Sequence, residues 1–182
     1  MKRSSKLTTR KLTLLALMTA AAVVLGYIEG MIAPLVALPP GIKLGLANTV
    51  VLYAIYTLGP GCSVILLILK VVLTGFMSGN LASTFLYSLG GGVLSRVMML
   101  LVRSLGRDKV SIVGVSVVGA VFHNIGQIAV FALLVQTGGL IYYAFVLMIA
   151  AVITGALTGL AGKQIIRILR LPGTTPGKKE GS

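Results

Sequence analysis

Cysteine, histidine and acidic side chains are scarce in this sequence of 182 residues, which contains one cysteine, one histidine and three aspartate or glutamate residues. Cys62 cannot form a disulfide within the chain, and the CxxC or CxxCH spacing of metal, redox and haem-attachment sites is missing. A single histidine, His123, cannot supply the two ligands of a bis-histidine haem site. We therefore expect no metal site and a free thiol that packs among apolar neighbours.

Charged residues of both signs make up only 10% of the chain, whereas hydrophobic residues make up 57% and the mean hydropathy is +1.03. Soluble domains contain about 25% charged residues. Apolar runs recur from Leu12 to Arg170, and a helix needs roughly 20 such residues to cross a bilayer core of about 30 Å. The alternating segments of a membrane barrel are missing. The sequence therefore predicts an all-α integral membrane protein with one domain.

Glycine, proline and polar residues divide the apolar sequence into six segments, which we predict to be six transmembrane helices. The predicted spans are Leu12–Ile32, Leu44–Leu58, Cys62–Met77, Leu81–Leu101, Val110–Val135 and Leu140–Leu169. They form one transmembrane domain over residues 12–170. A basic N-terminus, residues 1–11, precedes it, and a tail over residues 171–182 has the composition of a disordered segment.

The net charge of +13 comes from basic residues that flank the predicted spans. They gather before the first span, between the fourth and fifth spans, and after the sixth span. With six spans these three clusters lie on one side of the bilayer, which the positive-inside rule makes the cytoplasm. The pattern therefore predicts a multi-pass protein of the cell membrane with both termini cytoplasmic, and it argues against a nucleic-acid partner.

Several polar side chains fall within the predicted spans or at their outer ends, and all lie in the half that this topology places outside. They are Glu29, Lys43, Asn48, Asn80, His123, Asn124 and Gln127. Because an unpaired polar group in hydrocarbon is costly, we expect them to converge on an outward-opening cavity. Lys43 and His123 would attract an anionic or carbonyl-bearing ligand, and the amides would orient it. The alternative is that some of them hydrogen-bond neighbouring helices instead.

Two further features of the spans have more than one interpretation. Lys70 falls in the middle of the third span, where it either belongs to the cavity or pairs with a backbone carbonyl. Gly90-Gly91-Gly92 interrupts the fourth span, where it permits close approach of another helix or of a ligand. Gly155 and Gly159, four residues apart, indicate close helix packing in the sixth span.

Three stretches carry a family resemblance: PPGIKLGLANTVVLYAIYTLGP (39–60), SGNLASTFLYSLGGGVLS (78–95) and GVSVVGAVFHNIGQ (114–127). They resemble the Gx transporter family, also called heptaprenyl diphosphate synthase component I, over residues 10–170. That family is similar to the S components of energy-coupling-factor (ECF) transporters, six-helix bundles that capture vitamins or related molecules from outside. In those proteins two alanines on the first helix pack against a coupling transmembrane subunit, and Ala16 and Ala20 match them.

The resemblance implies three functions, of which the first is favoured. The chain would be a non-catalytic, S-component-like subunit that binds a vitamin-, prenyl- or quinone-related ligand. Because it contains no nucleotide-binding loop, it would need a coupling subunit and separate ATPases as partners. It would alternatively be an accessory component of heptaprenyl diphosphate synthase; Asp108 alone cannot form the aspartate-rich magnesium motifs of a catalytic subunit. The third possible function is that of a membrane subunit in an extracellular electron-transfer system. In that role the chain would hold a quinone or flavin and contact a flavinylated, membrane-anchored protein.

Overall fold

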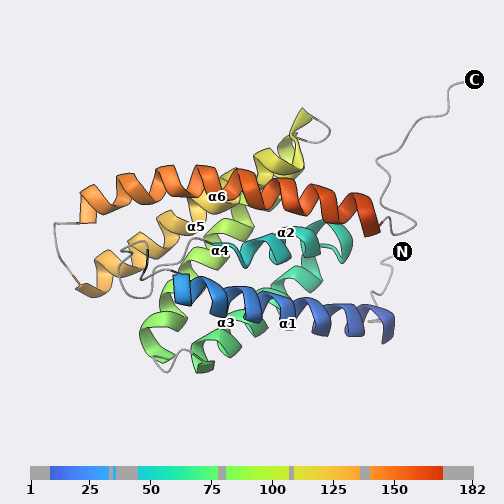
Figure 1. Cartoon of the computed structure of the whole chain (residues 1–182), viewed down its shortest axis with the longest axis horizontal. Coiled ribbons are helices and arrows are strands. Elements are labelled where there is room, and N and C mark those ends of the chain that lie inside the picture. Colours follow the sequence, from blue (N-terminus) through green and yellow to red (C-terminus); the bar gives the residue numbers. More distant parts are fainter. Residues whose placement is uncertain are drawn as a thin grey trace, which may run out of the picture.

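The computed structural model describes residues 9–32, 35, 45–77, 81–106, 109–135 and 140–169, and these residues form six α-helices and no strand. The helices are α1 (Thr9–Ile32), α2 (Asn48–Thr57), α3 (Pro60–Met77), α4 (Leu81–Gly106), α5 (Ile112–Val135) and α6 (Leu140–Leu169). The all-α prediction is confirmed. The beginning of α1 and the end of α6 lie toward the same end of the bundle (Figure 1).

Five helices of the described chain are long and apolar enough to cross a membrane: Thr9–Ile32, Pro60–Met77, Phe85–Gly106, Ile112–Leu134 and Ala144–Arg167. Large apolar side chains are exposed along them; Leu17 in α1 and Phe145 in α6 are 65% and 72% exposed. Such surfaces suit contact with lipid rather than with water. The helices therefore have the character of a multi-pass membrane protein.

The predicted count of six spans is not confirmed, because α2 has only ten residues. A helix of that length rises about 15 Å, roughly half of the hydrocarbon core. We predicted a span beginning at Leu44, but a turn over residues 45–47 takes up its first part. Gly45 adopts a φ of 87°, which lies in the left-handed region that ends regular helix geometry.

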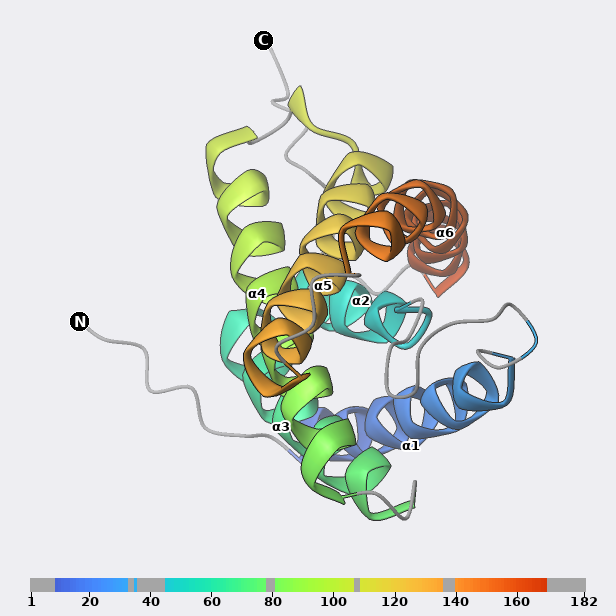
Figure 2. The same ribbon diagram turned by 90° about the vertical axis from the view of Figure 1, so that its left-hand side faces the viewer.

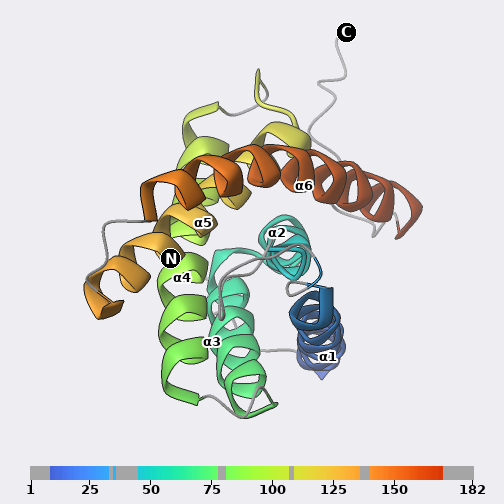
Figure 3. The ribbon, with the colours of Figure 1, turned by 60° about the vertical axis from the view of Figure 1, so that its left-hand side comes forward.

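The short helix α2 lies in the centre of the bundle, and it contacts each of the other five helices. Figures 2 and 3 show it between α1 and α3 on one side and α5 and α6 on the other. Val51, Leu52, Ala54 and Ile55 are at most 1% exposed. The hydrophobic core is therefore built around α2. Because the turn at Gly45 directly precedes this central helix, the turn also lies inside the protein.

Glycines bring α4, α5 and α6 into backbone contact. A Cβ atom on Gly126 would lie 2.6 Å from the carbonyl oxygen of Gly90, and one on Gly155 would lie 2.8 Å from the Cα of Val117. The close packing predicted for Gly155 and Gly159 is confirmed. The three consecutive glycines of α4 lie within one continuous helix, so they allow close approach without unwinding.

Arginines of α4 contact the last turn of α2 and the first turn of α3, at the opposite end of α2 from the Gly45 turn. The Arg103 side chain donates to the carbonyl oxygen of Ile55 and lies over the ring of Tyr56, 4.2 Å from its centroid. The Nε of Arg96 donates to the Ser63 hydroxyl at 3.0 Å. The Arg103 contact stabilises the C-terminal end of α2, because the negative end of the helix dipole attracts a cation.

Candidate functional site

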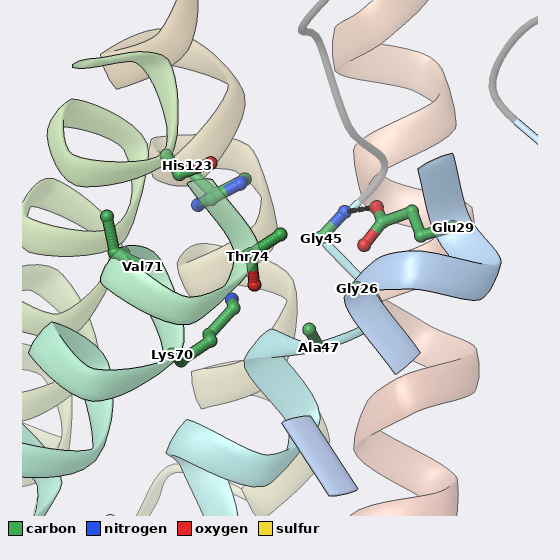
Figure 4. A pocket seen from close by; sticks show the side chains of 9 residues that line it. Gly26, Glu29, Gly45, Ala47, Lys70, Val71, Thr74 and His123 are labelled. Atoms are coloured by element: carbon green, nitrogen blue, oxygen red, sulfur yellow. Dashed lines mark hydrogen bonds between the residues drawn. The ribbon is translucent and has the colours of Figure 1, made fainter. Parts of the chain in front are cut away.

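A small cavity lies among α1, α3, α4, α5 and the turn that precedes α2 (Figure 4). It is lined by Gly26, Glu29, Gly45, Ala47, Lys70, Val71, Thr74, Ser88 and His123. It has room for about one water molecule in this conformation. Three ionisable side chains from three helices, Glu29, Lys70 and His123, therefore share one hollow within a predominantly apolar bundle.

Glu29 is tied to the turn before α2. Its carboxylate is 1% exposed and accepts a hydrogen bond from the backbone N–H of Gly45. A Cβ atom on Gly45 would lie 3.2 Å from the Nδ2 of Asn48 and 3.4 Å from the Cδ2 of His123. The turn is therefore enclosed by α1, α2 and α5, and only a residue without a side chain fits there without displacing its neighbours.

Lys70 reaches the same site from α3. Its Nζ donates to the Oδ1 of Asn48 at 3.0 Å, and both residues are 7% exposed. Burying an ammonium group costs several kcal/mol unless polar partners stabilise the charge. Its position in mid-span left two interpretations open from the sequence, and the structure places it in the cavity.

Two polar atoms at this site have no hydrogen-bond partner among the described residues. They are the hydroxyl of Thr74, which is 5% exposed and lines the cavity, and the Nδ2 of Asn48. Leaving such a group unsatisfied costs about 1–3 kcal/mol. Thr74 follows Lys70 by four residues, so both side chains lie on the same face of α3. Thr74 is not among the residues predicted from the sequence, although its i, i+4 spacing from Lys70 indicates a shared helix face.

The three polar residues of α5, His123, Asn124 and Gln127, have different surroundings. His123 lines the cavity. Asn124 is fully buried, and its Nδ2 donates to the carbonyl oxygen of Leu147 on α6 at 2.9 Å. Gln127 is fully buried beside Gly91, whose Cβ would lie 2.7 Å from its Cγ. Neither Asn124 nor Gln127 is among the residues that line the cavity, so Asn124 follows the helix-contact alternative.

The remaining predicted site residues divide into two groups. Lys43 and Asn80 lie outside the described residues, as do the tail over residues 171–182 and most of the basic N-terminus. Ala16 and Ala20 are exposed on the surface of α1. Among the described residues α1 contacts only α2 and α3. The ligand-binding and partner-binding roles of all these residues stay predictions.

Together the apolar helices and the buried ionisable groups define a helical membrane-type protein with an internal polar site. The sequence model of the family described as heptaprenyl diphosphate synthase component I matches residues 18–165, and the chain belongs to this family. The family resemblance of the sequence is thus confirmed. Neither the curated proteins nor the solved structures contain a significant match.

Proposed function

We propose that this chain is a membrane subunit that binds a small molecule in the cavity at Glu29, Lys70 and His123 and catalyses no reaction itself. The supporting observation is that these three side chains converge from α1, α3 and α5 although each is at most 7% exposed. Ionisable groups inside membrane helices are costly and mark ligand or ion sites by default. A purely structural contact would not require three of them.

The position of the site fits capture from one side of the membrane. Glu29 lies near the end of α1, Asn48 begins α2 and Thr74 lies near the end of α3. These positions belong to the same half of the bundle, away from the Arg103 contact at the other end of α2. In the topology predicted from the basic clusters this half faces outward. We accordingly propose capture of the ligand from outside.

For the transport role we propose a coupling membrane subunit and ATPases as partners. The exposed small side chains of Ala16 and Ala20 support a contact on α1, because small residues at i and i+4 let another helix approach closely. The peripheral position of α1, which packs only on α2 and α3 among the described residues, leaves that face accessible.

The second candidate is a non-catalytic accessory component of heptaprenyl diphosphate synthase. The family match over residues 18–165 favours it. In that role the partner would be a catalytic subunit, and the cavity would hold the polar end of a prenyl compound. The two candidates share a binding site and differ in the protein that assembles with the chain.

Native mass spectrometry after gentle detergent extraction tests the binding role. The wild-type chain should retain a small molecule, and His123→Ala should lose it because the imidazole lines the cavity. Leu157→Ala, at a position that is 61% exposed on α6, is the matched control and should retain it. Equal retention of the small molecule by His123→Ala would contradict the proposal. Co-purified ATPases or a co-purified prenyl synthase subunit then distinguish the two candidates.

A further inference from the structure

Several hydrogen-bond donors lie at or beside the cavity. Lys70, Thr74 and Gly45 line it, and the Nδ2 of Asn48 lies beside the Gly45 turn. The N–H of Gly45 donates to Glu29. The Thr74 hydroxyl and the Asn48 Nδ2 have no partner among the described residues, and both residues are more than nine-tenths buried. The Asn48 Nδ2 can only donate and the Thr74 hydroxyl can donate, so a ligand with acceptor atoms satisfies both.

The positive charge at the site favours anionic acceptor groups over neutral ones. Helix α2 begins at Asn48, and Ala47, which precedes its first residue, lines the cavity. The positive end of the α2 dipole therefore faces the same space as the Lys70 charge. Helix N-termini bind carboxylates and phosphates through this field. Ala47, the N-cap residue of α2, makes no side-chain hydrogen bond to the first turn of the helix.

In this structure the carboxylate of Glu29 lies near the positive end of α2. It is the one acidic residue in the described part of the chain. Its carboxylate accepts from Gly45 N–H and so ties α1 to the turn that precedes α2. Figure 4 shows this contact on one side of Gly45 and the Lys70, Thr74 and His123 side chains on the other.

We infer that the ligand carries an oxyanion, a carboxylate or phosphate group, which binds Lys70, Thr74 and Asn48 and replaces the Glu29 carboxylate on the Gly45 N–H. This inference rests on the proposed binding function and names the chemical class of the ligand. Since the cavity holds about one water molecule, the Gly45 turn must move to admit such a group. The hydrogen bond between Gly45 and Glu29 holds the turn against α1, so breaking that bond permits the movement.

Three small probes test the ligand class: butyl phosphate, butyrate and butanol, each added to the full chain in a neutral detergent. Binding is read from the rise in Tm with probe concentration, which gives an apparent Kd. One or both anions should stabilise the wild-type protein, and the stronger one identifies phosphate or carboxylate as the preferred group. Butanol, which has the same tail without the charge, should bind at least tenfold more weakly.

The variants test the assigned atoms. Lys70→Met should weaken anion binding at least tenfold, whereas Glu29→Gln should strengthen it at least threefold by removing the competing charge while keeping an acceptor for Gly45. Thr74→Val should weaken it several-fold, and Thr74→Ser, which keeps the hydroxyl, should not. If Lys70→Met fails to fold, the Thr74 pair decides. Butanol binding as tightly as the anions, or anion binding unaffected by both Lys70→Met and Thr74→Val, would overturn the inference.

Failure of the ligand class and failure of the binding function give different results. A retained small molecule that lacks an oxyanion contradicts the inference and leaves the binding function standing. No retained molecule on the wild-type chain, together with no effect of any probe, contradicts both.

Discussion

Lys70 on α3 and Asn48 at the start of α2 are joined inside the bundle by a 3.0 Å hydrogen bond from Nζ to Oδ1. This contact connects a buried positive charge to the central helix of the fold. It also positions the amide of Asn48 beside Gly45, next to the cavity. The same two residues therefore contribute to stability and, in our proposal, to ligand recognition.

We expect Asn48→Leu to lower the free energy of unfolding by about 1.5–3 kcal/mol, because it removes a hydrogen-bond partner from a buried charge. In Lys70→Met/Asn48→Leu the charge is gone as well, so the loss should be smaller than the sum of the two single losses. Unfolding by SDS in mixed micelles measures this double-mutant cycle. Additive effects, to within about 0.5 kcal/mol, would show that the two side chains do not interact.

Thr74→Val should raise the free energy of unfolding by about 1 kcal/mol, because it replaces a buried, unsatisfied hydroxyl with a methyl group of similar shape. Thr74→Ser keeps the hydroxyl and serves as the control that gains nothing. A more stable variant that binds anions less well would indicate that the hydroxyl is kept for the ligand. A loss of stability in Thr74→Val would instead indicate that the hydroxyl stabilises the fold.

Gly45→Ala should destabilise the protein for two separable reasons. The residue has a φ of 87°, and a Cβ would meet the Asn48 amide and the His123 ring. Gly59 has a φ of 88° and nothing within 4 Å of its Cβ position, so Gly59→Ala measures the backbone strain alone, about 1 to 2 kcal/mol. Gly45→Ala should lower the Tm further than Gly59→Ala. Equal shifts would mean that the site does not constrain the turn.

Gly126→Ala should separate α4 from α5, since its Cβ would lie 2.6 Å from the Gly90 carbonyl oxygen, a backbone atom that cannot rotate away. We expect a loss of about 2 kcal/mol, within the range for overpacked interiors. Gly30→Ala in α1 is the control, because nothing lies within 4 Å of its Cβ position and alanine favours a helix. Unchanged stability in Gly126→Ala would contradict the close contact.

Much of the fold could be predicted from the sequence, because long apolar runs and their punctuating glycines and prolines mark helix ends. The predicted bounds of α6, Leu140–Leu169, agree with the structure. Helix α2 was predicted too long because the left-handed conformation of Gly45 depends on its packing among Glu29, Asn48 and His123. Such tertiary packing leaves no local signal in the sequence.

The candidate site could be predicted only in part. Residue type and depth predicted a shared cavity for Glu29 and His123, and both residues line the cavity of the structure; their role in binding stays a prediction. The rotation of each helix about its axis decides which side chains face that cavity. Because these helices carry apolar residues on every face, the sequence pattern does not indicate which face that is. Asn124 therefore could not be distinguished from His123 by sequence, although it bonds to Leu147 on α6.

Modification of a cysteine in the cavity tests the central claim most directly. In a Cys62→Ser background, Thr74→Cys should react with a small, water-soluble thiol reagent in membrane vesicles, and the anion that binds best should slow that reaction at least fivefold. Leu157→Cys, on the apolar surface of α6, should stay unmodified with or without the anion. A cysteine at position 74 that reacts at the same rate with and without ligand, or never reacts, would contradict a ligand site at this cavity.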